Sequence, residues 1–219
     1  MDLKDKNMMY RIIRAVLKPL FIFAFRPEII GSENIPKCKG AVIAGNHKNA
    51  LDPILVDIST KRVVTALGKK ELHDGAFGFI FRAVGTIPVD LHSDNNHDAL
   101  KAAITALKNG KAINVSPEAK RNYTDELLLP FKYGAVSMSQ RADSPIIPYA
   151  ITGDYKFFSK NLKIAFGKPF KAGADLNRAN ERLYNEIADL LRKTMDKEEL
   201  CKKNFTSFRE WENGNKRSS

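Results

Sequence analysis

The sequence contains little cysteine, and its two cysteines lie too far apart along the chain to suggest a shared structural role. Cys38 and Cys201 belong to no CxxC motif and to no cluster with histidine. This pattern argues against a disulfide framework and against a structural zinc site, and it is typical of a reducing compartment. A secretory signal with a small-residue cleavage site is also lacking, so we expect a protein that is not exported.

A hydrophobic run long enough to span a membrane is missing as well. The apolar segment LFIFAF, residues 20–25, falls far short of the roughly 20 residues that a spanning helix needs. Before it, apolar residues follow helical spacing with basic residues between them: Met9, Ile12, Ile13, Val16, Leu17 and Leu20, with Arg11, Arg14 and Lys18. Such a helix is typical of a membrane interface, so we predict that residues 1–27 dock the protein peripherally on the cytoplasmic face of a membrane. The alternative is an ordinary packing helix followed by a strand.

Acidic residues are outnumbered by basic ones. The chain has 36 Lys and Arg against 25 Asp and Glu, which gives a net charge of +11. A surface of this charge attracts nucleic acid, anionic lipid headgroups or phosphorylated metabolites, and charge by itself selects no partner. The sequence contains no interleaved basic and aromatic segment and no recognisable nucleic-acid motif, which argues against nucleic-acid binding.

No internal repeat and no linker divides the 219 residues, a length that suits one domain. Short apolar runs alternate with amphipathic patterns, as in α/β proteins. Strands are expected at residues 40–46, 63–67, 86–91, 112–116, 145–151 and 162–170, and helices at 53–59, 75–85, 93–110, 132–142 and 177–196. We therefore predict a single α/β domain over residues 28–203, with a mostly parallel or mixed sheet flanked by helices. Residues 204–219 lose periodicity, which predicts a polar tail with a disordered end.

The segment AGNHKNALDPIL, residues 44–55, places His47 and Asp52 five positions apart, between an expected strand and an expected helix. Both side chains would lie at the carboxyl edge of the sheet, where open α/β folds bind ligands. A carboxylate on one ring nitrogen fixes the tautomer of the imidazole and leaves the other nitrogen free as a base. The alternative is that Asp52 caps the helix that begins near Pro53, and both roles can coexist.

No nucleophilic serine or cysteine accompanies this pair. The sequence contains no GxSxG motif, and Ser116, which precedes Pro117, lacks the flanking glycines of a nucleophile elbow. A covalent enzyme intermediate is therefore not indicated. A histidine base would instead act directly on a hydroxyl group of the substrate.

Cations cluster after the strand expected at residues 112–116. The segment NVSPEAKRNY contains Glu118, Lys120 and Arg121, and the segment LPFKYGA contains Lys132 beside an aromatic residue. Guanidinium and ammonium groups at a strand end suit a phosphate group. Glu118 would accept hydrogen bonds from a polyol hydroxyl or orient Arg121. The alternative is a solvated charged turn without a ligand.

Taken in order, these segments resemble the motifs of the glycerolipid acyltransferases of the 1-acylglycerol-3-phosphate acyltransferase (PlsC-like) type. NHKNALDP matches the NHx4D block of that family in full. GKKEL followed by GAFGFIFRAVGTIPVDL resembles the second block, SPEAKRN resembles the third, which is usually written FPEGTRS, and PFKYGA with SPIIPYAI resembles the remainder and the fourth. The resemblance covers most of the chain, from about residue 30 to about residue 170, and four motifs in register are a specific signal.

The resemblance implies a glycerolphosphate-acyltransferase-like fold, catalysis by His47 and Asp52, and no metal or organic cofactor. His47 would remove the proton of the acceptor hydroxyl as it attacks the thioester of acyl-CoA or acyl carrier protein, while Asp52 holds the imidazole. Residues expected to bind the substrate are Asn46, Glu118, Lys120, Arg121 and Lys132. The expected reaction converts lysophosphatidic acid to phosphatidic acid, and both acidic donors suit the basic surface.

The chain departs from the family pattern at the acceptor side. Leu91 stands where the second block usually closes with an arginine, and in the third block Ser116, Ala119 and Lys120 replace an aromatic residue, a glycine and a threonine. Alanine restricts the backbone more than glycine does, while Lys120 adds a cation where one is lost at Leu91. These changes leave open an acyltransferase of the same fold that acts on another lysolipid or on glycerol 3-phosphate. A non-catalytic lipid-binding module is a further alternative, against which the intact His47–Asp52 pair argues.

Overall fold

A single sheet forms the centre of the molecule. The computed structural model describes residues 3–75, 78–83, 85–90 and 96–217, and in these residues seven strands pair in the order β1-β7-β6-β2-β5-β3-β4. Their bounds are β1 Glu28–Ile30, β2 Ala41–Gly45, β3 Val64–Lys69, β4 Ile87–Val89, β5 Ala112–Val115, β6 Ile146–Thr152 and β7 Lys163–Phe166. Neighbouring strands run parallel except β6 and β7, which are antiparallel. The prediction of an α/β domain with a mostly parallel or mixed sheet is therefore confirmed.

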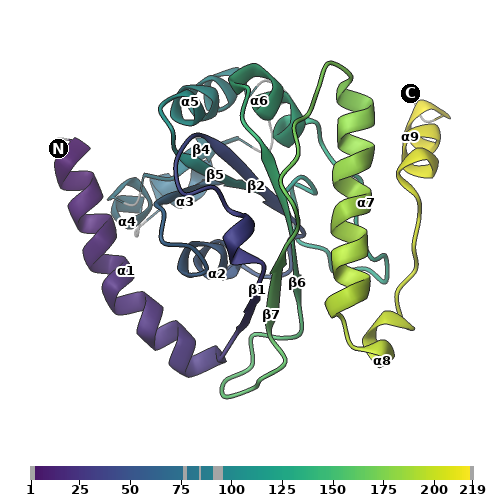
Figure 1. The fold of residues 1–219 in the computed structure, drawn as a ribbon, viewed down its shortest axis with the longest axis horizontal. Helices are drawn as coiled ribbons and strands as arrows, with labels where there is room; N and C mark the ends of the chain where they lie inside the picture. Colours follow the sequence, from purple (N-terminus) through teal and green to yellow (C-terminus); the bar gives the residue numbers. More distant parts are fainter. Residues whose placement is uncertain (1–2, 76–77, 84, 91–95, 218–219) are drawn as a thin grey trace.

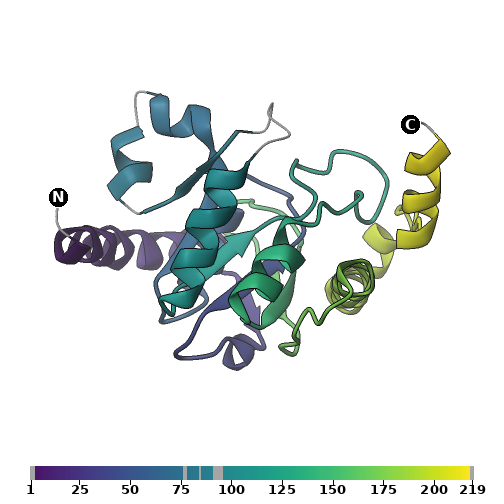
Figure 2. The same ribbon diagram turned by 90° about the horizontal axis from the view of Figure 1, so that it is seen from above.

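Helices cover both faces of this sheet. They are α1 Leu3–Phe25, a short 3-10 helix η1 Ser32–Asn34, α2 Asp52–Ile58, α3 Lys70–Asp74, α4 Gly78–Ala83, α5 His97–Lys108, α6 Gly134–Ala142, α7 Leu176–Thr194, α8 Lys197–Leu200 and α9 Phe208–Arg217. Helix α7 stands on one side of the sheet, and α1 and α2 stand on the other (Figure 1). Seen from above, α1 and α9 lie at opposite ends of the molecule (Figure 2).

The central strand β2 shows how the two hydrophobic cores arise. All five of its residues are buried, as expected for a strand with neighbours on both sides and helices on both faces. Because side chains alternate along a strand, Val42 and Ala44 join the core beneath α5, α6 and α7, while Ala41 and Ile43 join the core beneath α1 and α2. The continuous apolar run in the sequence is thus a strand that supplies both cores.

The expected elements at residues 40–46, 63–67, 112–116, 145–151 and 177–196 correspond to β2, β3, β5, β6 and α7 with small changes of boundary. The helix expected at 75–85 is present as α4, and the strand expected at 86–91 is present as β4. Residues 76, 77, 84 and 91–95 are outside the described part of the chain, and they include Leu91, the position of the family's arginine.

The N-terminal segment forms one helix, α1, which continues through Pro19 and through residues 20–25. The alternative of a strand in this segment is therefore wrong. Tyr10, Phe21 and Phe25 are buried against the domain, while the opposite side exposes apolar side chains: Ile12, Val16, Leu17, Leu20, Ile22 and Phe23. Among the described residues, no helix combines the length and hydrophobicity that crossing a membrane requires.

The C-terminal segment differs from its prediction. Residues 208–217 form α9, so the expected loss of periodic structure after residue 204 is wrong; residues 218 and 219 lie outside the described part. Phe208 is buried, and the indole Nε1 of Trp211 donates a hydrogen bond to the Tyr184 hydroxyl on α7 at 3.2 Å. Two aromatic residues three positions apart therefore hold this helix against the domain. Its other residues are polar, which is why the sequence did not indicate a packed helix here.

Candidate active site

The site lies at the carboxyl end of β2, between β5 and β6. Gly45 closes β2 at a point where an added Cβ would meet the Tyr149 ring and carbonyl oxygen of β6 at 2.4 Å, so the close approach of the two strands requires glycine. The next residue, Asn46, is 9% exposed; its Nδ2 donates to the Ile151 carbonyl at 3.0 Å and its Oδ1 accepts from the Ile151 amide at 2.8 Å. These two bonds fix the direction in which the chain leaves the sheet toward His47.

His47 and Asp52 form the predicted pair. The Nδ1 atom of His47 lies 2.9 Å from Oδ2 of Asp52, and the two side chains are 26% and 1% exposed. In the neutral imidazole, Nδ1–H then donates to the carboxylate, which leaves Nε2 with its lone pair available to a substrate. The geometry is that of a base held by a buried carboxylate.

Asp52 is held by several further donors. Its Oδ2 also accepts from the backbone amides of Lys48 at 2.7 Å and Asn49 at 2.8 Å, and its Oδ1 accepts from the Tyr155 hydroxyl at 2.6 Å. Both amides precede α2, and the N-cap residue Leu51 makes no side-chain capping bond. The prediction that Asp52 also caps the helix is therefore wrong: the carboxylate turns back into the loop, where it satisfies amides that would otherwise be buried without a partner.

Glu118 follows β5 and is 3% exposed. Its Oε1 accepts from the His47 amide at 2.8 Å, and its Oε2 accepts from the Leu129 amide at 2.9 Å. Burial raises the pKa of Glu118 to about 7, and the two backbone hydrogen bonds oppose this effect without cancelling it. Both carboxyl oxygens thus have partners inside the protein, and they connect the His47 backbone to the loop of residues 116–133.

Ala119 occupies the position where the family has glycine, and it takes a left-handed backbone conformation with φ of 58°. This conformation costs an alanine about 1 kcal/mol relative to the right-handed one. Two backbone hydrogen bonds stabilise the turn: Ala119 N–H donates to the Ser116 carbonyl at 3.0 Å, and Asn122 N–H donates to the His47 carbonyl at 3.0 Å. The alanine is therefore held in the left-handed conformation by the hydrogen bonds of the surrounding loop.

The predicted phosphate ligands project from this same loop. The side chains of Lys120, Arg121 and Lys132 are exposed, and none takes part in the ion pairs found between described residues. The Arg121 guanidinium lies 5.4 Å from the centre of the Tyr123 ring, a distance typical of a cation–π contact. Because the loop is bonded to His47 through Glu118 and Asn122, these cations belong to a segment that is joined directly to the histidine loop.

Three contacts of the site were not predicted. Tyr155 reaches Asp52 from the loop after β6, and Lys48 pairs with Glu199 of α8 at 3.2 Å and with Asp154 at 3.5 Å. Each of these contacts joins residues about 100 or more positions apart in the chain. No periodic pattern or motif in the sequence relates such distant positions.

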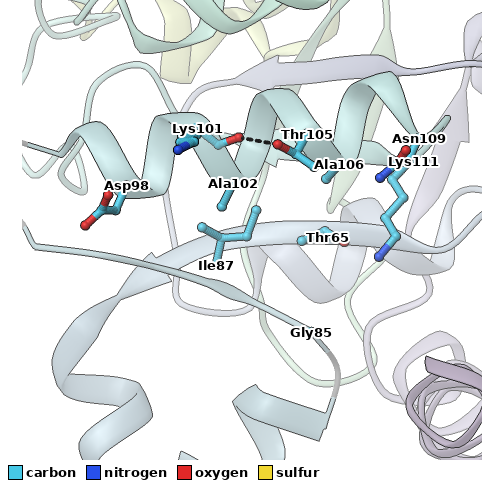
Figure 3. A pocket seen from close by; sticks show the side chains of 10 residues that line it. All are labelled: Thr65, Gly85, Ile87, Asp98, Lys101, Ala102, Thr105, Ala106, Asn109 and Lys111. Carbon is cyan, nitrogen blue, oxygen red and sulfur yellow. Dashed lines mark hydrogen bonds between the residues drawn. The ribbon is translucent and has the colours of Figure 1, made fainter. Parts of the chain in front are cut away.

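A cavity of about 460 Å³ lies elsewhere, between α5 and the strands β3 and β4 (Figure 3). Asp98, Lys101, Thr105 and Lys111 line its helix side, and Thr65 and Ile87 line its sheet side. None of its lining residues belongs to the His47–Asp52 pair or to the loop of residues 116–133. In the described part of the chain, no group of three or more His, Cys, Asp or Glu side chains converges as a metal site requires.

Comparison with known proteins agrees with this geometry. Residues 26–152 match the family model described as Acyltransferase. A 1-acyl-sn-glycerol-3-phosphate acyltransferase of Borreliella burgdorferi is 28% identical over 71% of this chain and 63% of its own length. The Bacillus subtilis protein of the same name is 27% identical over 74% of this chain and 82% of its own length, and the mouse alpha form is 27% identical over 68% and 54%.

Among solved structures, the crystal structure of the 1-acyl-sn-glycerophosphate (LPA) acyltransferase of Thermotoga maritima superposes with a TM-score of 0.70. The superposition covers 86% of this chain and 80% of the Thermotoga protein at 21% sequence identity, which establishes the shared fold. Of the relatives compared by sequence, the chain covers 63% of the length of the Borreliella protein and 54% of the mouse protein, less than two thirds of either.

Proposed function

Because this chain belongs to the acyltransferase family, we propose that it transfers a fatty acyl group from a thioester to the free hydroxyl of 1-acylglycerol-3-phosphate, which yields phosphatidic acid. The observation that carries this proposal is the pairing of His47 Nδ1 with the buried Asp52 carboxylate. Relatives named 1-acyl-sn-glycerol-3-phosphate acyltransferase support the choice of acceptor.

In this reaction the Nε2 atom of His47 takes the proton of the acceptor hydroxyl while the hydroxyl oxygen attacks the thioester carbonyl. The new ester bond forms as the carbon–sulfur bond breaks, and the proton passes from His47 to the departing thiolate. Asp52 keeps the imidazole in the required tautomer and balances the charge of the imidazolium. Acyl-CoA and acyl carrier protein are both suitable donors, and both are anions that a chain with a net charge of +11 attracts.

The residues expected to bind substrate divide into two groups. Lys120, Arg121 and Lys132 are exposed cations, and we assign the acceptor phosphate to them. Asn46 and Glu118 are buried with internal partners, so their geometry supports a role in positioning the His47 loop rather than direct contact with substrate.

The test of this function is acyl transfer by the purified protein. Thiol release and lipid product are measured with acyl-CoA and with acyl carrier protein, with lysophosphatidic acid as acceptor and His47→Ala as the inactive variant. We expect product formation by the wild type and a loss of about 100-fold or more in the variant. Thiol release that His47→Ala leaves unchanged would contradict the proposal.

A second acceptor remains a specific candidate because Ala119 and Lys120 depart from the family pattern. The same assay with glycerol 3-phosphate and with other lysophospholipids discriminates between lysophosphatidic acid and another acceptor as the substrate. If the protein acylates one of these acceptors and not lysophosphatidic acid, the proposed acyl transfer stands and the proposed acceptor is wrong.

The exposed apolar side of α1 supports peripheral docking on an anionic membrane, with the cytoplasmic face as the proposed side. We expect the double variant Leu20→Ser, Phe23→Ser to bind anionic liposomes about tenfold or more weakly, because both side chains are more than half exposed and free to insert. Liposome co-sedimentation measures this, with Phe205→Ser as the matched control, an exposed aromatic beside α7. Undiminished binding of the double variant would contradict docking through α1.

A further inference from the structure

Tyr155 makes a direct contact with the catalytic pair from a segment that the family model does not cover. The model ends at residue 152, and β6 ends at the same residue. The Tyr155 hydroxyl donates to Oδ1 of Asp52 at 2.6 Å, whereas His47 and the two loop amides all use Oδ2. The two carboxylate oxygens of Asp52 therefore have separate tasks.

The backbone of the loop after β6 directs Tyr155 toward Asp52. Gly153 has φ of 72°, and an added Cβ would lie 1.9 Å from the Asn161 carbonyl oxygen, so this turn admits no side chain. Farther along, Phe158 N–H donates to the Ala24 carbonyl of α1 at 2.7 Å. The loop is thus bound at one end to the sheet and at the other end to the last turn of α1.

Aromatic packing joins the Tyr155 ring to α1. The ring lies edge-on to Phe21 and to Phe25, with centroid distances of 6.2 Å and 5.7 Å. Phe157 stacks on the other side of Phe25 at 5.3 Å. We call Phe21, Phe25, Tyr155 and Phe157 the aromatic clasp, and its two α1 members are among the buried residues of that helix.

The Tyr155 hydroxyl retains the proton that it donates to Asp52. Burial, and then the negative charge of Asp52, raise the pKa of this hydroxyl well above the ordinary value for tyrosine. The hydroxyl therefore keeps its proton at neutral pH. A donor on Oδ1 restricts rotation of the carboxylate, and this keeps Oδ2 directed at His47 Nδ1.

We propose that Tyr155 is a positioning residue of the His47–Asp52 pair, and that the aromatic clasp makes the orientation of Asp52 depend on the seating of α1. The proposal rests on the acyl transfer described above. Tyr155 does not contact the reacting atoms; it acts through Asp52. Since α1 also carries exposed apolar side chains, a displacement of this helix would reach His47 through two ring contacts and two hydrogen bonds, Tyr155 to Asp52 and Asp52 to His47.

The test compares Tyr155→Phe with Tyr184→Phe. Both variants remove a buried tyrosine hydroxyl, but that of Tyr184 donates to the Thr206 carbonyl, away from the pair. We expect Tyr155→Phe to lower kcat by about 10- to 100-fold, as for a lost hydrogen bond to a charged group, with the KM for the acceptor within about twofold. Tyr184→Phe should leave kcat unchanged. An unchanged kcat in Tyr155→Phe, or a rise of KM in place of the fall in kcat, would overturn the proposal.

A second arm tests the dependence on α1. We expect Phe25→Leu to lower kcat several-fold, Phe205→Leu, at an exposed aromatic beside α7, to lower it little, and Phe25→Leu combined with Tyr155→Phe to fall no further than Tyr155→Phe alone. Additive losses in the double variant would overturn the coupling through the clasp.

A spectroscopic arm separates this proposal from the proposed function. The ¹H–¹⁵N resonance of His47 Nδ1–H reports its bond to Asp52 without any substrate, and we expect it to shift or broaden in Tyr155→Phe and to stay unchanged in Tyr184→Phe. If the wild type transfers no acyl group but this resonance responds to Tyr155→Phe, the acyltransferase function fails and the positioning role stands. A resonance that is the same in both variants would refute the positioning role even in an active enzyme.

Discussion

The histidine loop, residues 46–52, and the cation loop, residues 116–133, are joined to one another by hydrogen bonds, yet their side chains are held in opposite ways. In the histidine loop, the side chains of Asn46 and Asp52 are buried and bonded to partners inside the protein, and that of His47 is only 26% exposed. In the cation loop the backbone is fixed to His47, but Lys120 and Arg121 extend into solvent. Under the proposed function, this difference would mean that the base is preorganised and that the acceptor is recognised by adaptable side chains.

The strongest test of this contrast is Asp52→Asn, which keeps the shape of the side chain and removes its charge. An amide cannot accept from every donor around both oxygens of Asp52, and it does not balance an imidazolium. We expect kcat to fall by about 10³-fold, measured as acyl transfer at saturating acceptor. Asp189→Asn on α7 is the control, since this carboxylate is 60% exposed and pairs with Arg192 on the same helix; a comparable loss there would show that the effect is not specific to the buried carboxylate.

Glu118→Gln tests the junction between the two loops. Glutamine can accept from only one of the two amides, at His47 or Leu129, and its NH₂ group opposes the other. We expect a loss of about 1–3 kcal/mol in the free energy of unfolding and a fall of roughly tenfold in kcat. Denaturant titration and acyl transfer measure the two effects. Glu186→Gln on the surface of α7 is the control. If Glu118→Gln behaved like this control, the two hydrogen bonds that Glu118 accepts would be dispensable.

The raised pKa of Glu118 also predicts a dependence of stability on pH. With a pKa of about 7 in the folded protein, Glu118 binds a proton more tightly than it does in the unfolded chain. Its contribution to stability is therefore present at acidic pH and is lost as the pH rises to about 7.

We expect the free energy of unfolding of the wild type to decline between about pH 5 and pH 7 more steeply than that of Glu118→Gln. Asp57, whose pKa burial also raises to about 7, is common to both proteins, so the difference isolates Glu118. Parallel pH profiles would contradict this assignment.

Arg121→Ala tests the adaptable side of the comparison. Removing one exposed cation from a group of three should raise the KM for lysophosphatidic acid about three- to tenfold and change kcat little, because the neighbouring lysines partly compensate. An uncharged monoacylglycerol serves as the comparison acceptor, and Arg141→Ala on α6 serves as the control variant. An equal change of KM for the charged and uncharged acceptors would argue against a phosphate contact.

Ala119→Gly should produce the smallest effect. Glycine relieves the left-handed strain at φ of 58°, but it also increases the conformational entropy of the unfolded chain. The two terms oppose each other, so we expect the free energy of unfolding to change by less than about 1 kcal/mol, with activity unchanged. A large loss of activity would show that the alanine methyl group itself contributes to the site.

The sequence identified those features whose partners are close along the chain. His47 and Asp52 are five positions apart, and the loop between them is short enough to bring the two side chains within reach of one another. Strands such as β2 and helices such as α7 were predictable because hydrophobic periodicity reports burial directly. The helix α9 was missed because Phe208 and Trp211 are its only large apolar residues, and a segment this polar was taken for a solvated tail.

Only the tertiary structure decided what holds the base in place. Glu118 lies 71 positions from His47, and Tyr155 lies 103 positions from Asp52. They meet because β5 and β6 both pair with β2 in parallel, which brings the segments that follow all three strands to one edge of the sheet. The sequence by itself determined the reactive pair, since local spacing encodes it. The order of the strands determined the partners of that pair, because contacts between distant segments exist only after the sheet has assembled.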